Sequence, residues 1–231
     1  MKILSVRQGF ASDHSSTSYE FLAIDKPLSK ESRSKVSSLS KRVNPTARRA
    51  SFEYHVDGYD IPCGWEELMK KYYDVMYSES YGSWILGIAF NCDWDQYVKI
   101  CPYEFEGSDE VGSVEIESYK GRVVITINCI IDSWFDSGYD SEDYDEDDED
   151  YEDDEGESGQ GNENVSIVTD DGLLQVLAEI RQQIMSGDYR ALYALWETYG
   201  DEEAEDQPPI PESRDTGAKT VKNFKDMLGK I

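Results

Sequence analysis

Few residues of this chain combine the types and spacing that covalent catalysis requires. The best local combination is His14 beside Ser15 and Ser16, which places an imidazole base next to two hydroxyl nucleophiles. Neighbours in sequence seldom form a catalytic triad, because its members usually converge from separate elements. We therefore interpret these hydroxyl groups as caps of backbone groups in a tight turn. No catalytic residue and no cofactor is expected.

The sequence also gives little support for a metal site. The four cysteines are Cys63, Cys92, Cys101 and Cys129. Because 28, 8 and 27 residues separate them, they form no C-x-x-C pair, and His14 and His55 are the only histidines. The acidic part of the chain lacks the spacing of a calcium-binding loop, so only diffuse counterion binding is expected there. We predict four mostly buried structural thiols and no metal.

The sharpest local motif is Gly187-Asp188-Tyr189-Arg190. In a structural interpretation, Gly187 ends one helix, Asp188 caps the next, and Tyr189 packs inward with Trp196. In a functional interpretation, Arg190 pairs with a carboxylate or binds a partner. Phosphate-binding and hydrolase interpretations have no starting point, because the chain lacks G-x-x-x-x-G-K-S/T, G-x-G-x-x-G and G-x-S-x-G.

The strongest chemical feature is a run of carboxylates. Residues 136–157 hold fifteen Asp and Glu and no Lys or Arg. Without them, 49 acids against 22 bases become 34 against 22, and the net charge changes from −27 to −12. Self-repulsion opposes collapse of such a segment, so we expect a long acidic disordered insertion at 134–164 that suits capture of a basic protein partner. The partner-binding residues that we assign are Asp145, Glu146, Asp147, Asp148, Glu149, Asp150 and Arg190.

The basic residues are concentrated in one stretch. Lys26 to Arg49 contains eight Lys or Arg and one acid, Glu31. A solvated helix face is one interpretation, and phosphate contact is another. A third is that the acidic segment folds back on this stretch, because tethering raises its effective concentration there. Direct nucleic-acid binding is not expected, since a net charge of −27 repels nucleic acid at long range.

Strands that must support these groups are predicted from short apolar or alternating runs. They cover residues 19–24, 51–59 and 83–90, with a further short strand at 165–168. The clearest hairpin pairs residues 112–119 with 122–130 through the two-residue turn Lys120-Gly121. The second strand of this hairpin is rich in β-branched residues, which favour extended structure.

Helices are predicted from apolar residues that recur on one face. Ser29 is expected to cap the first helix, whose stripe is Leu28, Val36, Leu39 and Val43. A second helix begins near Trp65, and its apolar face is Trp65, Leu68, Met69, Tyr72 and Met76. Asp170 or Asp171 caps a third, whose inward residues are Leu173, Leu174, Leu177, Ile180 and Ile184.

The third helix and a following one at 189–199 are expected to form a C-terminal helical hairpin. The inward face of the later helix is Tyr189, Leu192, Trp196 and Tyr199. Beyond an extended Pro208-Pro209-Ile210-Pro211 linker, a last helix is predicted with Val221, Phe224 and Leu228 inward.

The fold class predicted from these elements is α+β, with a mostly antiparallel sheet and packed helices. The expected organisation is a core at 1–133, the acidic loop at 134–164, and a helical part at 165–231 that packs on the same core. No run approaches the ~20 apolar residues of a transmembrane helix, and the first residues turn polar too soon for a signal peptide. We expect a protein of the reducing cytoplasm, with no membrane contact.

Two blocks of this sequence resemble a family of uncharacterised bacterial proteins. The first is Tyr19-Glu20-Phe21 followed by Ala23-Ile24-Asp25-Lys26-Pro27-Leu28, and the second runs from Gly187 to Trp196. An acidic stretch and a Pro-Pro-x-Pro element follow the second block in the family, as they do here. Residues 9–19 are similar to the Gly-Phe-x-Ser-Asn-Ser-rich opening of small phage and bacterial proteins, with Asp13-His14 as a departure. Neither resemblance implies a catalytic residue.

Three classes of function remain. The leading hypothesis is a non-enzymatic accessory or interaction protein whose acidic loop engages a basic protein partner. The alternative is a nucleic-acid mimic, whose carboxylates would occupy the cationic groove of a DNA- or RNA-binding protein. A mimic needs ordered, spaced carboxylates on a folded face, whereas most of the excess charge here lies in one low-complexity run. The third is an enzyme with an unrecognised site, which would need a cleft where Asp, Arg and Tyr side chains converge.

Overall fold

A computed structural model describes residues 17–41, 43, 45–54, 61–80, 83–107, 112–130, 170–201 and 206–212 of the chain. The described elements, in chain order, are β1 (Thr17–Leu22), α1 (Lys30–Ser37), β2 (Arg49–Tyr54), α2 (Trp65–Lys71), β3 (Val75–Ser80), β4 (Ser83–Asn91), α3 (Trp94–Ile100), the short 3-10 helix η1 (Cys101–Tyr103), β5 (Val114–Tyr119), β6 (Arg122–Ile130), α4 (Asp170–Met185) and α5 (Arg190–Tyr199).

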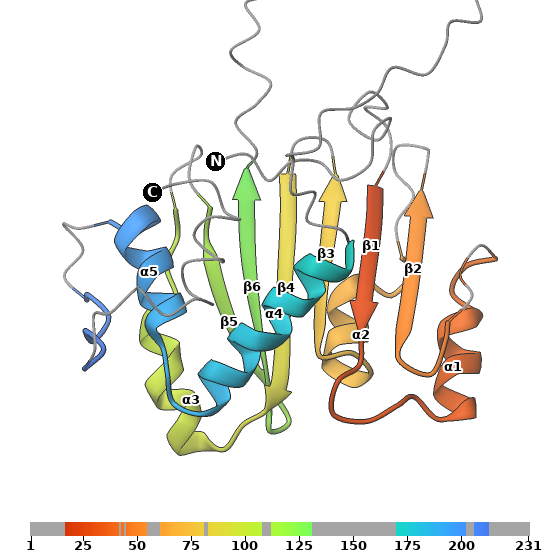
Figure 1. Cartoon of the computed structure of the whole chain (residues 1–231), viewed down its shortest axis with the longest axis horizontal. Helices are drawn as coiled ribbons and strands as arrows, with labels where there is room; N and C mark the ends of the chain where they lie inside the picture. Colours follow the sequence, from red (N-terminus) through yellow and green to blue (C-terminus); the bar gives the residue numbers. More distant parts are fainter. Residues whose placement is uncertain are drawn as a thin grey trace, which may run out of the picture.

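One sheet of six strands organises these elements. The strand order is β2-β1-β3-β4-β6-β5, and every neighbouring pair is antiparallel. Figure 1 shows α4 crossing one face of the sheet, while α2 lies behind it and α1 stands beyond β2. The predicted α+β class with an antiparallel sheet and packed helices is thereby confirmed.

The predicted hairpin is present with its predicted turn. β5 and β6 pair from Tyr119 opposite Arg122 to Val114 opposite Ile127. Lys120 and Gly121 connect them with φ of 51° and 80°. Two successive positive φ values define the type I′ turn, whose twist matches that of the flanking strands. The dipeptide therefore determines the local register of this edge of the sheet.

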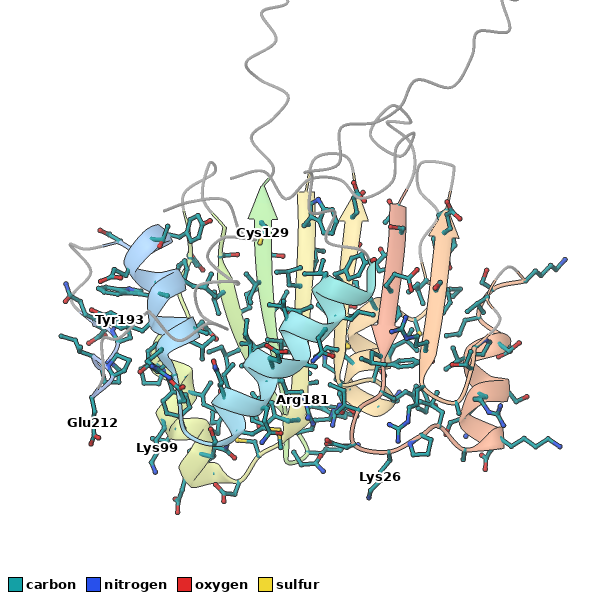
Figure 2. The ribbon with its side chains drawn as sticks, in the orientation of Figure 1. Lys26, Lys99, Cys129, Arg181, Tyr193 and Glu212 are labelled. Atoms are coloured by element: carbon teal, nitrogen blue, oxygen red, sulfur yellow. The ribbon has the colours of Figure 1, made fainter. Side chains whose placement is uncertain are left out.

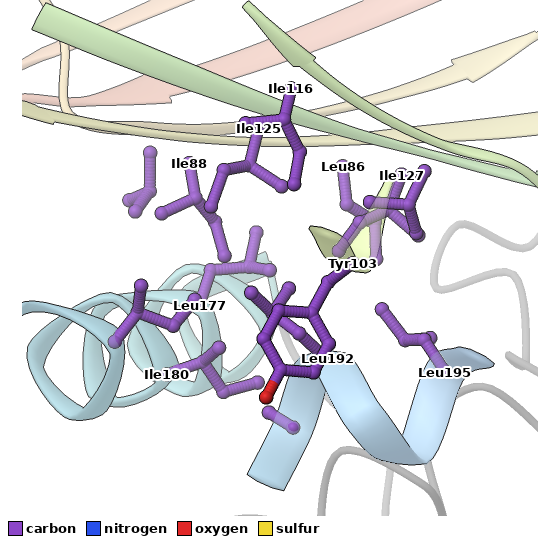
Figure 3. Close-up of a cluster of buried hydrophobic side chains, with 14 of the residues drawn as sticks. Leu86, Ile88, Tyr103, Ile116, Ile125, Ile127, Leu177, Ile180, Leu192 and Leu195 are labelled. Carbon is purple, nitrogen blue, oxygen red and sulfur yellow. The ribbon is translucent and has the colours of Figure 1, made fainter. Parts of the chain in front are cut away.

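The apolar face that carries α4 and α5 forms the larger core. Strand residues such as Leu86, Ile88 and Ile125 contribute from below. The predicted stripe of α4 is fully buried against them: Leu173, Leu174, Leu177, Ile180 and Ile184. Figure 3 shows Leu177 of α4, the ring of Tyr103, and Leu192 and Leu195 of α5 as members of one buried cluster. The two helices predicted from the apolar residues of 173–184 and 189–199 are therefore present, as α4 and α5. That these two helices pack on one another as a hairpin stays a prediction.

The opposite face has its own core, formed with α1 and α2. Phe21, Phe52 and Tyr73 pack there, with ring centroids 5.2 to 5.8 Å from Phe21. The first predicted stripe lies in this core, because Leu28, Val36 and Val43 are buried and Leu39 is partly buried. Ser29 caps α1 as predicted, since its Oγ accepts the Ser32 N–H at 3.1 Å.

The predicted helix at Trp65 was too long. α2 ends at Lys71, and Met76 lies in β3, which the sequence analysis missed. Met76 packs on Gly87 of the neighbouring strand, where an added Cβ would lie only 2.7 Å from its Cγ. Because Gly87 has no side chain, Met76 lies over it and reaches the same core as Met69 of α2 from a strand position. The prediction that Met76 packs in the core with the residues of α2 is therefore correct, although Met76 lies in a strand and not in the helix.

A second missed element is α3, which begins at Trp94. Asp93 caps it, because its carboxylate accepts the Gln96 N–H at 2.8 Å. Predicted segments at 55–59, 134–164, 165–168 and the last helix after residue 212 lie outside the described residues.

Trp196 tests the helical side of this fold. It is 9% exposed, and its ring lies 5.8 Å from that of Tyr193. We expect Trp196→Ala to lower the free energy of unfolding by about 3–5 kcal/mol, because it leaves a large cavity in the core. Urea unfolding measures this. Gln182→Ala, at an exposed position of α4, is the control and should change it by less than about 0.5 kcal/mol. An equal effect of both variants would contradict the described packing.

Candidate functional site

Charged side chains from four separate elements meet inside the fold, at the sheet edge where β1 ends and β6 begins. Asp74 is at their centre, directly before β3, and is buried. One of its oxygens accepts the backbone N–H groups of Ile24 at 2.6 Å and Asp25 at 2.9 Å. This single carboxylate therefore holds the turn that follows β1.

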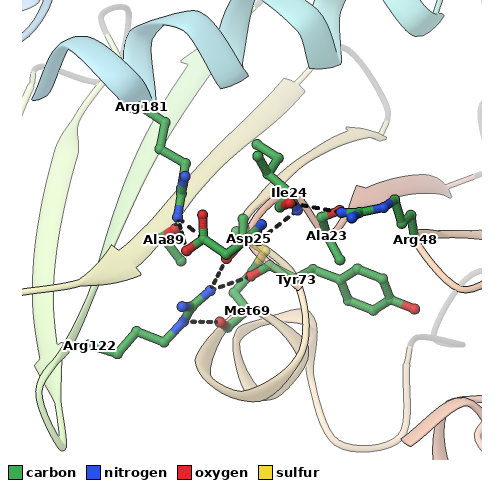
Figure 4. A network of polar contacts seen from close by, with 10 residues as sticks. Ala23, Ile24, Asp25, Arg48, Met69, Tyr73, Ala89, Arg122 and Arg181 are labelled. Atoms are coloured by element: carbon green, nitrogen blue, oxygen red, sulfur yellow. Dashed lines mark hydrogen bonds and ion pairs between the residues drawn. The ribbon is translucent and has the colours of Figure 1, made fainter. Parts of the chain in front are cut away.

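Arg122, the first residue of β6, provides the matching cation. Its Nη2 donates to the other oxygen of Asp74 at 2.8 Å and to the Tyr73 carbonyl at 2.7 Å. Its Nε donates to the Met69 carbonyl at 2.9 Å, at the end of α2. Figure 4 shows this side chain reaching from the strand to the helix. One guanidinium thus joins the sheet to the α2 layer.

Arg181 reaches the same centre from the opposite helical layer. It is 2% exposed, although it belongs to α4. Its Nε donates to the Ala89 carbonyl at 2.8 Å, and its Nη2 donates to Asp25 at 2.5 Å and lies 3.7 Å from Asp74. Asp25 is the solvent-facing member, with 40% of its side chain exposed. Two guanidinium groups and two carboxylates therefore meet with balanced charge.

The electrostatics keep Asp74 ionised. Burial by itself would raise the pKa of its carboxyl group. The hydrogen bonds from Arg122 and from the backbone of Asp25 and Ile24, with the charge of Arg181, outweigh burial and lower the pKa below its ordinary value. An ionised Asp paired with arginines is a poor proton donor or acceptor near neutral pH. The arrangement is therefore suited to holding three layers together, not to acid–base catalysis.

A further arginine extends the network along the turn. Arg48, just before β2, donates from Nη1 to the carbonyls of Ala23 at 2.9 Å and Ile24 at 2.7 Å. The turn after β1 is thus held by Asp74, which accepts its N–H groups. Arg48 holds the same turn by donating to its carbonyls (Figure 4).

Of the residues that the sequence assigned to partner binding, the structure describes only Arg190. Asp145 to Asp150 lie outside the described residues. The Arg190 guanidinium donates to both oxygens of Asp188, at 2.8 and 2.7 Å. This bond lowers the pKa of Asp188. Arg190 therefore pairs with a carboxylate, one of the two roles considered for it.

The structural interpretation of the same motif needs one correction. Tyr189, not Asp188, is the N-cap residue of α5. Asp188 still accepts the Arg190 N–H at 3.2 Å. The same Oδ1 of Asp188 also accepts the Nε–H of Arg190, so the carboxylate binds both the backbone and the side chain of this residue. Gly187 ends the preceding helix with φ of 87°, as predicted.

The structure also places the basic stretch and the thiols. Lys30 and Lys35 of α1 are exposed, as in the solvated-helix interpretation, while Arg48 is drawn into the network. All four cysteines are free thiols. The prediction that they are mostly buried was wrong, because Cys63 is exposed and the others are partly buried. His14, Ser15, Ser16 and His55 lie outside the described residues.

Sequence reasoning missed the network, although one signal was visible. Arg181 follows Leu177 by four residues and Leu174 by seven, so it lies on the apolar stripe of its helix. A charged residue at such a position must find a buried partner. No spacing in the sequence identifies that partner, since Asp25 and Asp74 are 156 and 107 residues away.

Arg122 is the most direct test of the network. Arg122→Met would leave Asp74 with one distant cation in a buried position. We expect a loss of about 3–5 kcal/mol in the free energy of unfolding, measured in urea. The matched control is Lys70→Met, which breaks the partly exposed Lys70–Glu117 pair at 3.2 Å and should cost less than about 1 kcal/mol. Equal losses would show that Asp74 is accommodated without Arg122.

The lowered pKa of Asp74 gives stability a dependence on pH. A carboxyl group whose pKa is lower in the folded state stabilises the fold above its unfolded pKa of about 3.9. That stabilisation is lost as the pH falls through the folded pKa. Asp74→Asn should therefore be much less stable than the native protein at pH 7, and the difference should shrink below about pH 4. A difference that stays constant from pH 7 to pH 3 would contradict the described ionisation.

The part of the chain that the structure describes has neither a membrane-spanning helix nor a cluster of metal ligands. Within the described ranges, no helix combines the length and apolar character needed to cross a membrane. Among the same residues, no three His, Cys, Asp or Glu side chains converge as metal ligands. Comparison of the chain with family models, curated protein sequences and solved structures finds no match.

Proposed function

We propose that this chain is a non-enzymatic interaction protein whose acidic segment, residues 136–157, engages a basic protein partner. The observation that carries the proposal is the concentration of fifteen carboxylates, without one Lys or Arg, in a single insertion of the fold. Charge of one sign at this density attracts a basic surface from a distance and speeds the encounter.

The fold gives this segment a defined point of attachment. It belongs to residues 131–169, which connect the end of β6 at Ile130 to the start of α4 at Asp170. The buried network lies at the other end of β6, at Arg122. Nine strand residues separate the two ends by about 27 Å. That is more than three times the screening distance of about 8 Å in physiological salt, so a charge at the attachment point itself has little effect on the network.

The folded part supports a binding role more than a catalytic one. The described cluster of Asp and Arg side chains is engaged in internal pairs. Within this proposal, residues 134–164 are a disordered insertion, and the free thiols agree with a reducing cytoplasm. Disorder also favours simple charge attraction over nucleic-acid mimicry, which needs carboxylates at defined positions.

The proposal predicts that the charge of the segment, and not its order, determines binding. Three forms of the full chain would be used to capture partners from the native cell. The first is the native protein, and the second has the fifteen acids of 136–157 changed to Asn or Gln. The third keeps the native composition of 136–157 but places its residues in scrambled order. We expect native and scrambled proteins to capture the same basic protein and the neutralised variant to lose it. Association in stopped flow should slow steeply between 50 and 500 mM salt.

Unfolding midpoints of the three forms provide the control, because the segment should be dispensable for folding. Undiminished capture by the neutralised variant would show that the segment is only a solubilising spacer. Loss of capture on scrambling would favour nucleic-acid mimicry, in which the positions of the carboxylates matter.

A further inference from the structure

We propose that the exposed apolar face of α3 is the docking surface for residues 219–231 of the same chain. α3 is a short helix between β4 and η1. Its Trp94 is 71% exposed and its Val98 47%, and both are among the few large apolar side chains that the described residues leave so open to solvent. They are four positions apart, so they lie on one side of the helix.

The surface is ordered before anything covers it. On its inner side, α3 is anchored by the fully buried Ile100 and by Gln96, whose side chain donates to the Met185 carbonyl at 3.3 Å. On its outer side, the indole of Trp94 lies 5.6 Å from the ring of Tyr97. An exposed tryptophan held against a second ring loses little entropy on binding, which is typical of an anchor in an interface.

The described chain ends close to η1, which directly follows α3. The Tyr103 hydroxyl, three residues after α3, donates to the Pro209 carbonyl at 2.9 Å. Figure 2 shows Lys99 of α3 and Glu212 at the same end of the molecule. Nine residues from Glu212 to Val221 reach at most about 30 Å, whereas α3 and η1 together span about 15 Å. Residues 219–231 are therefore tethered within reach of Trp94.

The chemistry of this segment matches the surface. Val221, Phe224 and Leu228 recur at helical spacing, which gives one apolar stripe. Residues 219–231 also contain four Lys against one Asp. Asp93 and Asp95, at the start of α3, are exposed and offer the opposite charge. An apolar stripe flanked by cations fits an aromatic surface flanked by carboxylates, and tethering raises the effective concentration.

Hydrogen exchange of the full chain, read by mass spectrometry, tests this docking. We expect backbone amides of 219–231 to exchange at least about tenfold more slowly than in an unstructured peptide. Val98→Asp should abolish that protection, because it places a charge in the apolar contact. Lys99→Asp is the matched control, because it introduces the same residue at the next position, which is exposed but lies off the side of α3 that carries Trp94 and Val98. The amides of 219–231 should stay protected in this variant. Amides of β4 and β6 report that the fold is intact in both variants.

The reciprocal variant makes the test independent of α3 stability. Phe224→Ser changes only residues 219–231 and leaves α3 itself unaltered. If docking slows the exchange of backbone amides in α3, this variant should restore the faster exchange. Free exchange of 219–231 in the native chain would overturn the proposal, and so would protection that survives Val98→Asp. Protection that weakens on tenfold dilution would also overturn it, because the segment would then bind a second copy.

Discussion

The ion pair between Asp74 and Arg122 imposes the strictest constraint on this fold. Removing a carboxylate from water costs several kcal/mol unless a cation and hydrogen-bond donors replace the solvent. Asp74 obtains both, from Arg122 and from the backbone of the turn after β1. Each donor must be within about 3 Å in the correct direction. The start of β6, the end of β1 and the start of β3 are therefore held in one arrangement.

Apolar packing alone would specify this arrangement less sharply. Two separate cores cover the faces of the sheet, and each gains stability from any dense packing of similar side chains. Hydrogen bonds from a guanidinium are directional, by contrast. Arg181 ties α4 to the edge of β4, while Arg122 ties α2 to the start of β6. The two helical layers thus share one polar centre, and the cores fill the space around it.

The buried charges balance one another at one edge of the sheet, and the acidic segment is attached at the other. The exposed Trp94 of α3 lies at the same edge of the sheet as the network, because it follows Asn91, the strand partner of Arg122, by three positions. The two binding features that we propose for the chain therefore differ in character, one acidic and one aromatic.

Local sequence was sufficient wherever short-range geometry determines structure. The Lys120-Gly121 turn, the Ser29 cap and the α4 stripe all depend on residues a few positions apart. β3 was missed because Met76 continues a helical spacing, and only contact with Gly87 shows that it lies in a strand. The polar centre was beyond sequence reasoning for the same physical reason. Its partners, from Asp25 to Arg181, are distant along the chain, and only the antiparallel order of the sheet brings them within hydrogen-bonding distance.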